Sequence, residues 1–185
     1  MADKKQYGFT LVEIIVSLLV ASVILSFAGV FIFIGERIFA DFTDKNHAKI
    51  IGDSSLEFVT KTLRYSNNVK IAYSGEPIAE YQNALWISPQ GQLFYENNNQ
   101  SGFSVFGNEF YSGKQLSLEI SMLSDHCILI GIYVLKNGES LYFSHTAVSL
   151  INISLGDGIV DFKFPEETTA DNPTVLFNMY SAENE

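Results

Sequence analysis

The architecture of this chain follows from residues 9–34, which read FTLVEIIVSLLVASVILSFAGVFIFI. As a helix rising ~1.5 Å per residue, this run extends ~39 Å, enough to cross a hydrocarbon core of roughly 30 Å. Glu13 is its one ionisable side chain. We therefore predict a transmembrane helix that carries a carboxylate close to its start.

The charges on either side of this run predict its orientation. Lys4 and Lys5 precede it, whereas Glu36, Asp41 and Asp44 follow it. Because Lys and Arg are retained on the cytoplasmic side of a span, the N-terminus is expected in the cytoplasm and the rest of the chain outside.

Three ordinary kinds of N-terminal segment fit less well. A cleaved secretory signal has an apolar core of about 7–15 residues before a small-residue site, but here Ser26-Phe27-Ala28 lies inside a longer run. A plain signal anchor fits the length but gives no role to Glu13, although charge inside a membrane is costly and usually functional. A lipoprotein signal needs a cysteine at its processing site, and the single cysteine is Cys127.

The segment KKQYGFTLVE, Lys4 to Glu13, resembles the class III signal of type IV prepilins and type II secretion pseudopilins. The resemblance implies that a prepilin peptidase cuts between Gly8 and Phe9 and methylates the new N-terminus at Phe9. Glycine leaves the backbone accessible to a peptidase. The resemblance also gives Glu13 a role in assembly, in which it pairs with the N-terminal amine of a neighbouring subunit, because a buried charge needs a partner.

Beyond residue 34, apolar residues recur among charged ones at helical spacing, namely Ile38, Phe42, Ile51, Phe58, Val59 and Leu63. No proline occurs between Phe9 and Tyr65, so the helix is expected to continue as an amphipathic segment over 35–66. Gly29, Gly35 and Gly52 are expected to loosen or bend it. Ser66-Asn67-Asn68 is expected to end it.

From residue 69 onward, short β-prone runs alternate with turn residues. The expected strands are 69–73, 84–88, 92–95, 116–122, 127–135, 140–144, 148–154, 159–164 and 175–180. Asn137-Gly138 predicts a type I′ hairpin turn, and Pro89-Gln90-Gly91 predicts a second turn. The polar stretches 96–102 and 165–173 read as exposed loops.

Together these patterns predict an α+β fold, in which a long N-terminal transmembrane and spine helix packs on a C-terminal antiparallel β-sheet, as in pilins. The expected divisions are a leader peptide at 1–8 and a transmembrane or filament-core helix at 9–34. An amphipathic continuation is expected at 35–66, and a β-rich extracytoplasmic domain at 67–185. Aromatic residues are expected to fill the core between helix and sheet: Tyr73, Tyr81, Trp86, Phe94, Tyr95, Phe103, Phe106, Phe110 and Tyr111.

Composition excludes several kinds of function. With 11 basic and 21 acidic residues, the formal charge is −10, which disfavours a general nucleic-acid surface. One cysteine cannot form an intrachain disulfide, and we expect Cys127 to be a buried apolar residue.

No constellation of residues predicts catalysis, a cofactor or a metal. Asp125-His126-Cys127 has residue types used in nucleophilic catalysis, but neighbours in a strand face opposite ways. His47, on the helix surface, and His145, after a strand, have no metal-site spacing with His126.

A calcium site was also considered at the turn Gly156-Asp157-Gly158 with Asp161. An ordinary hairpin turn fits better, since calcium takes 6–8 oxygen ligands.

The leading functional hypothesis is a minor pilin or pseudopilin of a type IV pilus or a secretion or competence pseudopilus. Its expected partners are prepilin peptidase, other subunits, and the cytoplasmic membrane with its assembly platform. Size and the turn and strand at 158–164 resemble the minor subunits grouped as pilin W or pseudopilin J, which help prime assembly at the tip. The alternatives are a tip adhesin or DNA-uptake subunit that uses the polar loops, and a membrane-anchored extracytoplasmic binding domain.

Overall fold

A computed structural model describes residues 10–72, 81–97, 100–124, 126–151, 160–162 and 172–179. The chain divides into two compact units, Met1–Asp44 and Lys45–Glu185. Helix α1, Leu11–Arg64, contributes to both units. The predicted long N-terminal helix is confirmed, but Ser66-Asn67-Asn68, expected to end it, instead begins a strand.

The second unit contains two sheets and one short helix. In the six-stranded sheet the order is β4-β3-β2-β9-β1-β8. These strands are β1 Ser66–Ala72, β2 Asn83–Ile87, β3 Leu93–Asn97, β4 Gln100–Ser104, β8 Val160–Phe162 and β9 Thr174–Met179. The three-stranded sheet, in the order β5-β6-β7, consists of Gln115–Ser124, Cys127–Lys136 and Glu139–Ser149. Helix α2 is Asn108–Tyr111.

The strands are antiparallel to their neighbours, as predicted, except that β1 and β8 pair in parallel. A parallel pair needs a long connection, and here β2 to β7 lie between its two strands in the sequence. The C-terminal strand β9 lies between β1 and β2, with Phe177 opposite both Val69 and Asn83. The two sheets meet where the Leu116 N–H donates to the Gly91 carbonyl at 2.8 Å.

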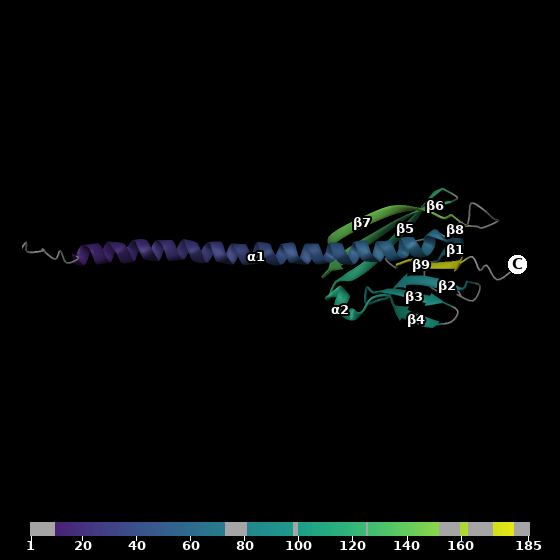
Figure 1. Cartoon of the computed structure of the whole chain (residues 1–185), viewed down its shortest axis with the longest axis horizontal. Coiled ribbons are helices and arrows are strands. Elements are labelled where there is room, and N and C mark those ends of the chain that lie inside the picture. Colours follow the sequence, from purple (N-terminus) through teal and green to yellow (C-terminus); the bar gives the residue numbers. More distant parts are fainter. Residues whose placement is uncertain are drawn as a thin grey trace, which may run out of the picture. The chain divides into compact units, whose positions relative to one another are not determined.

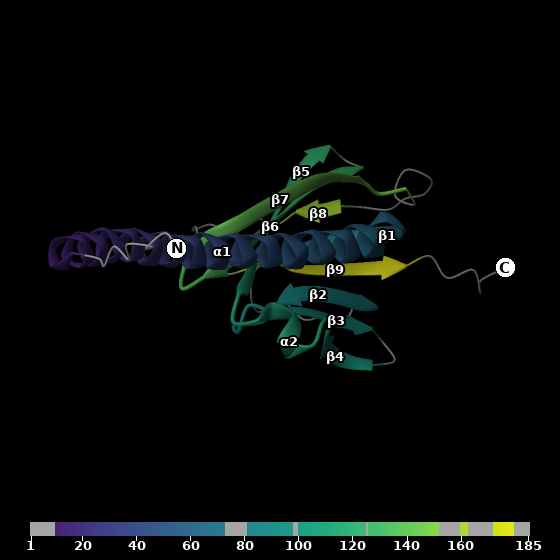
Figure 2. The same cartoon turned by 60° about the vertical axis from the view of Figure 1, so that its left-hand side comes forward.

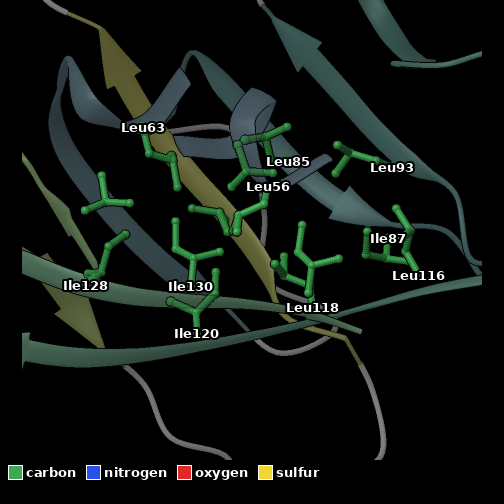
Figure 3. Packing of buried hydrophobic residues seen from close by; sticks show 14 of the residues in the cluster. Leu56, Leu63, Leu85, Ile87, Leu93, Leu116, Leu118, Ile120, Ile128 and Ile130 are labelled. Atoms are coloured by element: carbon green, nitrogen blue, oxygen red, sulfur yellow. The ribbon is translucent and has the colours of Figure 1, made fainter. Parts of the chain in front are cut away.

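Within the second unit, the last part of α1 runs between the strands β5 to β7 on one side and β2 to β4 on the other (Figure 1, Figure 2). Its buried residues recur every three or four positions: Ala48, Ile51, Gly52, Ser55, Leu56, Val59 and Leu63. Figure 3 shows Leu56 and Leu63 pointing into one cluster that includes side chains from both sheets. The helix therefore covers an apolar core to which both sheets contribute.

The predicted helical stripe is confirmed only in the second unit. Ile51, Val59 and Leu63 are fully buried there, and Phe58 packs against the same cluster. Ile38 and Phe42, the earlier members of the stripe, are exposed. The apolar stripe thus finds cover within the chain only from Ala48 onward.

Both predicted turns are confirmed. Asn137 and Gly138 have φ of 54° and 83° between β6 and β7, as a type I′ hairpin requires. Gly91, with φ of 76°, closes the turn between β2 and β3, where its N–H donates to the Ser88 carbonyl at 2.8 Å.

The expected polar loop at 96–102 is wrong, because it covers parts of two paired strands. Strand β3 continues to Asn97 and β4 begins at Gln100, opposite Asn97. Phe103 of β4 packs edge-on to Tyr95 with ring centroids 5.7 Å apart. An edge strand with few core contacts needs few apolar residues, so its composition resembles that of a loop.

The separate strand expected at 148–154 is also not found, since Val148 and Ser149 are the end of β7. Residues 152–154 and 163–171, with most of the second expected loop, lie outside the described residues. Helix α2 was not predicted, and its four residues are too few to show a helical period.

The aromatic residues fill the core only in part. Tyr111 is fully buried, whereas Tyr95, Phe106 and Phe110 are half-buried against the main cluster. Tyr81 and Trp86 pack on a smaller cluster, Phe94 stacks on Trp86, and Phe103 is exposed. Tyr73 lies outside the described residues.

Candidate N-terminal processing and assembly site

The start of α1 is formed by reciprocal hydrogen bonds between Thr10 and Glu13. The Glu13 N–H donates to Thr10 Oγ1 at 3.3 Å. In return, Glu13 Oε2 accepts from the Thr10 N–H and from the Thr10 hydroxyl, both at 3.2 Å. This is a capping box, in which two backbone donors without helical partners are satisfied by side chains.

The capping box gives Glu13 a local role that the sequence analysis did not assign. A Thr followed three positions later by a Glu, ahead of an apolar run, is the signature of such a box and was available in the sequence. The negative carboxylate also lies in the first turn, where it opposes the positive end of the helix dipole. Gly8 and Phe9, the predicted cleavage residues, lie outside the described residues.

The helix that follows exposes a large apolar surface. In the first unit the described residues from Leu11 to Thr43 are all exposed, although most are Leu, Ile, Val, Phe or Ala. Among the described residues, α1 is the one helix long and apolar enough to cross a membrane. An apolar surface that surrounds a helix requires lipid or other apolar helices around it.

Within the second unit, a polar cluster links α1 to β7. Lys49 Nζ lies 2.7 Å from Asp53 Oδ2, and the Tyr142 hydroxyl donates to Asp53 Oδ1 at 2.7 Å. Burial acts to raise the pKa of Asp53, but hydrogen bonds from Lys49 and Tyr142 outweigh it, so the pKa is lowered.

Gly52, expected to loosen the helix, instead permits a close approach. A Cβ on Gly52 would lie 2.7 Å from Cδ1 of the Tyr142 ring, closer than van der Waals contact allows. The glycine therefore makes room for the tyrosine, and the helix continues through this position.

The residues considered for chemistry do not come together. Among the described residues, no group of three or more His, Cys, Asp or Glu side chains is placed to hold a metal ion. Cys127 is a free thiol that is half-buried, rather than fully buried as predicted. His145 lies within β7 rather than after a strand. His47 Nδ1 lies 3.3 Å from Lys114 Nζ.

The remaining positions considered for chemistry are only partly described. Asp125 and residues 156–158 lie outside the described residues, and of Asp161 only the backbone in β8 is described.

The architecture is that of an α+β protein with an apolar N-terminal helix that fits a single-pass membrane anchor. The protein-family profile described as the prokaryotic N-terminal methylation motif matches residues 3–29. This prepilin-type motif supports membership of the type IV pilin and pseudopilin family. No curated protein and no solved structure matches the chain.

Proposed function

We propose that this chain is a minor subunit of a type IV pilus or related pseudopilus. Prepilin peptidase cuts between Gly8 and Phe9 and methylates Phe9, and the apolar helix then leaves the membrane to pack with the helices of other subunits. The observation that carries the proposal is the methylation motif at 3–29, which runs directly into an exposed apolar helix joined to a β-rich unit. The protein acts as a structural component.

In this proposal the N-terminus faces the cytoplasm before assembly, and the second unit lies outside the membrane. Lys4 and Lys5 in the leader support that orientation. Cleavage removes Asp3, Lys4 and Lys5, and the side-chain charge changes from 11 − 21 = −10 to 9 − 20 = −11.

Replacing Gly8 with leucine tests the processing step. In its native host, the wild-type chain should begin at N-methylated Phe9 by mass spectrometry, whereas the Gly8→Leu chain should keep residues 1–8. Gly29→Leu is the matched control, because it adds the same side chain within the helix and should leave cleavage intact. A wild-type chain that keeps residues 1–8 beside an active peptidase, or begins after Ala28, contradicts the proposal.

Glu13 should act after cleavage, once Phe9 has a free amine. Glu13→Ala removes both the capping acceptor and the charge, while Glu13→Gln keeps an acceptor for the capping box and removes only the charge. If pairing with a neighbour's amine matters, both variants should be cleaved and both should be depleted at least tenfold from sheared filaments. Normal incorporation of Glu13→Gln would reduce the role of Glu13 to capping.

The minor role rests on the resemblance to the pilin W and pseudopilin J types. Quantitative mass spectrometry of sheared filaments should therefore find this chain well below the major subunit. A dominant amount would reject the minor role and leave the processing proposal intact.

A further inference from the structure

Strand β6 has the sequence of a strand that is covered on both faces. Residues 127–135 read CILIGIYVL, without a charged or amide side chain. Ile128, Ile130, Ile132 and Val134 are fully buried in the core. A sheet with one face in water normally alternates apolar and polar residues, whereas a continuous apolar run is typical of burial on both faces. The opposite face of β6 is therefore built for a cover as well.

That opposite face, here called the outer face, is made of the alternate residues of β5, β6 and β7. They are Gln115, Ser117, Glu119, Ser121, Leu123, Cys127, Leu129, Gly131, Tyr133, Leu135, Phe143, His145, Ala147 and Ser149. The side chain of Phe143 is 43% exposed, and His145 and Ala147 are exposed as well. Apolar and aromatic surface on this face is thus open to solvent.

Three stacked rings form the centre of the outer face. The Tyr133 and Phe143 centroids lie 4.3 Å apart with planes 27° apart, and Phe143 and His145 lie 5.3 Å apart with planes 18° apart. Gly131 leaves room for this stack, since a Cβ there would lie 3.0 Å from Phe143 Cε2. Rings held in one arrangement lose little conformational entropy on binding and are suited to anchor a protein partner.

The charge of the outer face indicates the kind of partner. Its carboxylate, Glu119, accepts a hydrogen bond from the neutral Tyr133 hydroxyl at 2.9 Å, and the outer face contains no Lys or Arg. The whole chain carries a formal charge of −10. A second copy would bring the same negative charge, whereas a different chain with a Lys or Arg opposite Glu119 would be complementary.

The size of the outer face indicates how that partner is held. Three strands ~4.8 Å apart and nine residues long at ~3.3 Å per residue cover roughly 430 Å². A standard interface buries about 800 Å² on each partner, so this face alone supports only weak binding. Such a contact becomes stable when the two chains are already tethered, because tethering raises their effective concentration.

We propose that the outer face of β5–β7 binds the globular domain of a different subunit in the same filament, through an apolar surface that sets a Lys or Arg against Glu119. This inference rests on the proposed function, since packed N-terminal helices supply the tether. The rings provide the apolar anchor, and Glu119 selects a different chain over a second copy.

Photo-crosslinking in the native host tests the contact. A benzoylphenylalanine at position 143 should give, in sheared filaments, a covalent adduct with another processed subunit, at a peptide that contains Lys or Arg. Position 103 is the matched control, because Phe103 is a strand phenylalanine with 42% exposure on the other sheet. It should give at least tenfold less of this adduct.

A charge reversal tests the selectivity. Glu119→Lys should lower the adduct from position 143 at least fivefold, and changing the partner's opposing basic residue to Glu should restore it. Glu109→Lys, which reverses an exposed carboxylate on α2, is the matched control and should leave the adduct unchanged. The thermal unfolding midpoint of each variant separates a lost contact from a lost fold.

The outcomes distinguish this inference from the proposed function. An adduct of two copies of this chain, or filaments that contain the chain without an adduct at position 143, would overturn the outer-face proposal and leave the subunit proposal standing. Absence of the processed chain from filaments would overturn both.

Discussion

The two parts of helix α1 differ in how they use apolar residues. Up to Thr43 its described residues are exposed although mostly apolar, whereas from Ala48 to Leu63 the apolar residues are buried beneath two sheets. Charged residues on the later part form ion pairs on its exposed side, such as Lys61 with Glu57. Hydrophobicity is therefore satisfied inside the chain in one part, and must be satisfied by lipid or other helices in the other.

The largest expected effect comes from removing the covered part of the helix. A chain that begins at Glu36 keeps the helical cover and should show a cooperative thermal transition by circular dichroism. A chain that begins at Tyr65 exposes the core of both sheets and should show none, because a sheet with one apolar face needs a cover. Equal stability and monomeric behaviour of the two chains would refute the helix-on-sheet packing.

Neighbouring isoleucines test the same contrast at single-residue scale. Ile51 is 0% exposed and Ile50 is 52% exposed, one position apart on the same helix. Ile51→Ala should lower the free energy of unfolding by about 2–5 kcal/mol, as large-to-small core changes do. Ile50→Ala should change it by less than about 1 kcal/mol. Denaturant unfolding of the full chain in detergent measures both, and similar losses would contradict the assigned helical face.

The elements that were predictable from sequence depend on neighbouring residues. The long helix follows from an uninterrupted apolar run, and the β6–β7 hairpin follows from Asn137-Gly138, which accepts positive φ at both positions. The capping box at Thr10 and Glu13 has an equally local signature, so it could have been predicted.

The features that were missed depend on residues far apart in the chain. Strand β4 is short and polar because it forms a sheet edge, and only its pairing with β3 identifies it. The central place of β9 depends on β1, which lies at the other end of the second unit's sequence. The contact of Gly52 with Tyr142 joins a helix to a strand about ninety positions away, and no local pattern encodes it.

Gly52 and Gly29 provide a matched pair across the two parts of the helix. A Cβ at Gly52 would meet the Tyr142 ring, whereas at Gly29 it meets nothing within 4 Å. Gly52→Ala should lower the free energy of unfolding by about 1–3 kcal/mol through overpacking. Gly29→Ala should leave the unfolding of the second unit unchanged. Adding Tyr142→Leu should recover part of the loss, and its failure to do so would show that the ring is not the obstacle.

The smallest expected effect concerns the Asp53 cluster, through its dependence on pH. The pKa of Asp53 in the folded chain lies below its ordinary value of 3.8, so the unfolded chain takes up a proton at a higher pH than the folded chain does. The stabilisation by the carboxylate is therefore complete above the unfolded pKa and is lost as pH falls through the folded pKa.

Because the side chains of Lys49 and Asp53 are 57% and 44% exposed, the effect should be no more than about 1 kcal/mol. Asp53→Asn should thus be less stable than wild type at pH 7 and pH 5, and the difference should shrink towards zero below pH 3.8. Denaturant unfolding at these values measures it. Glu57→Gln, which removes the more exposed pair with Lys61, is the control and should have the smaller effect at pH 7. A difference for Asp53→Asn that stays constant down to the lowest pH would mean that the carboxylate's charge does not stabilise the contact between α1 and β7.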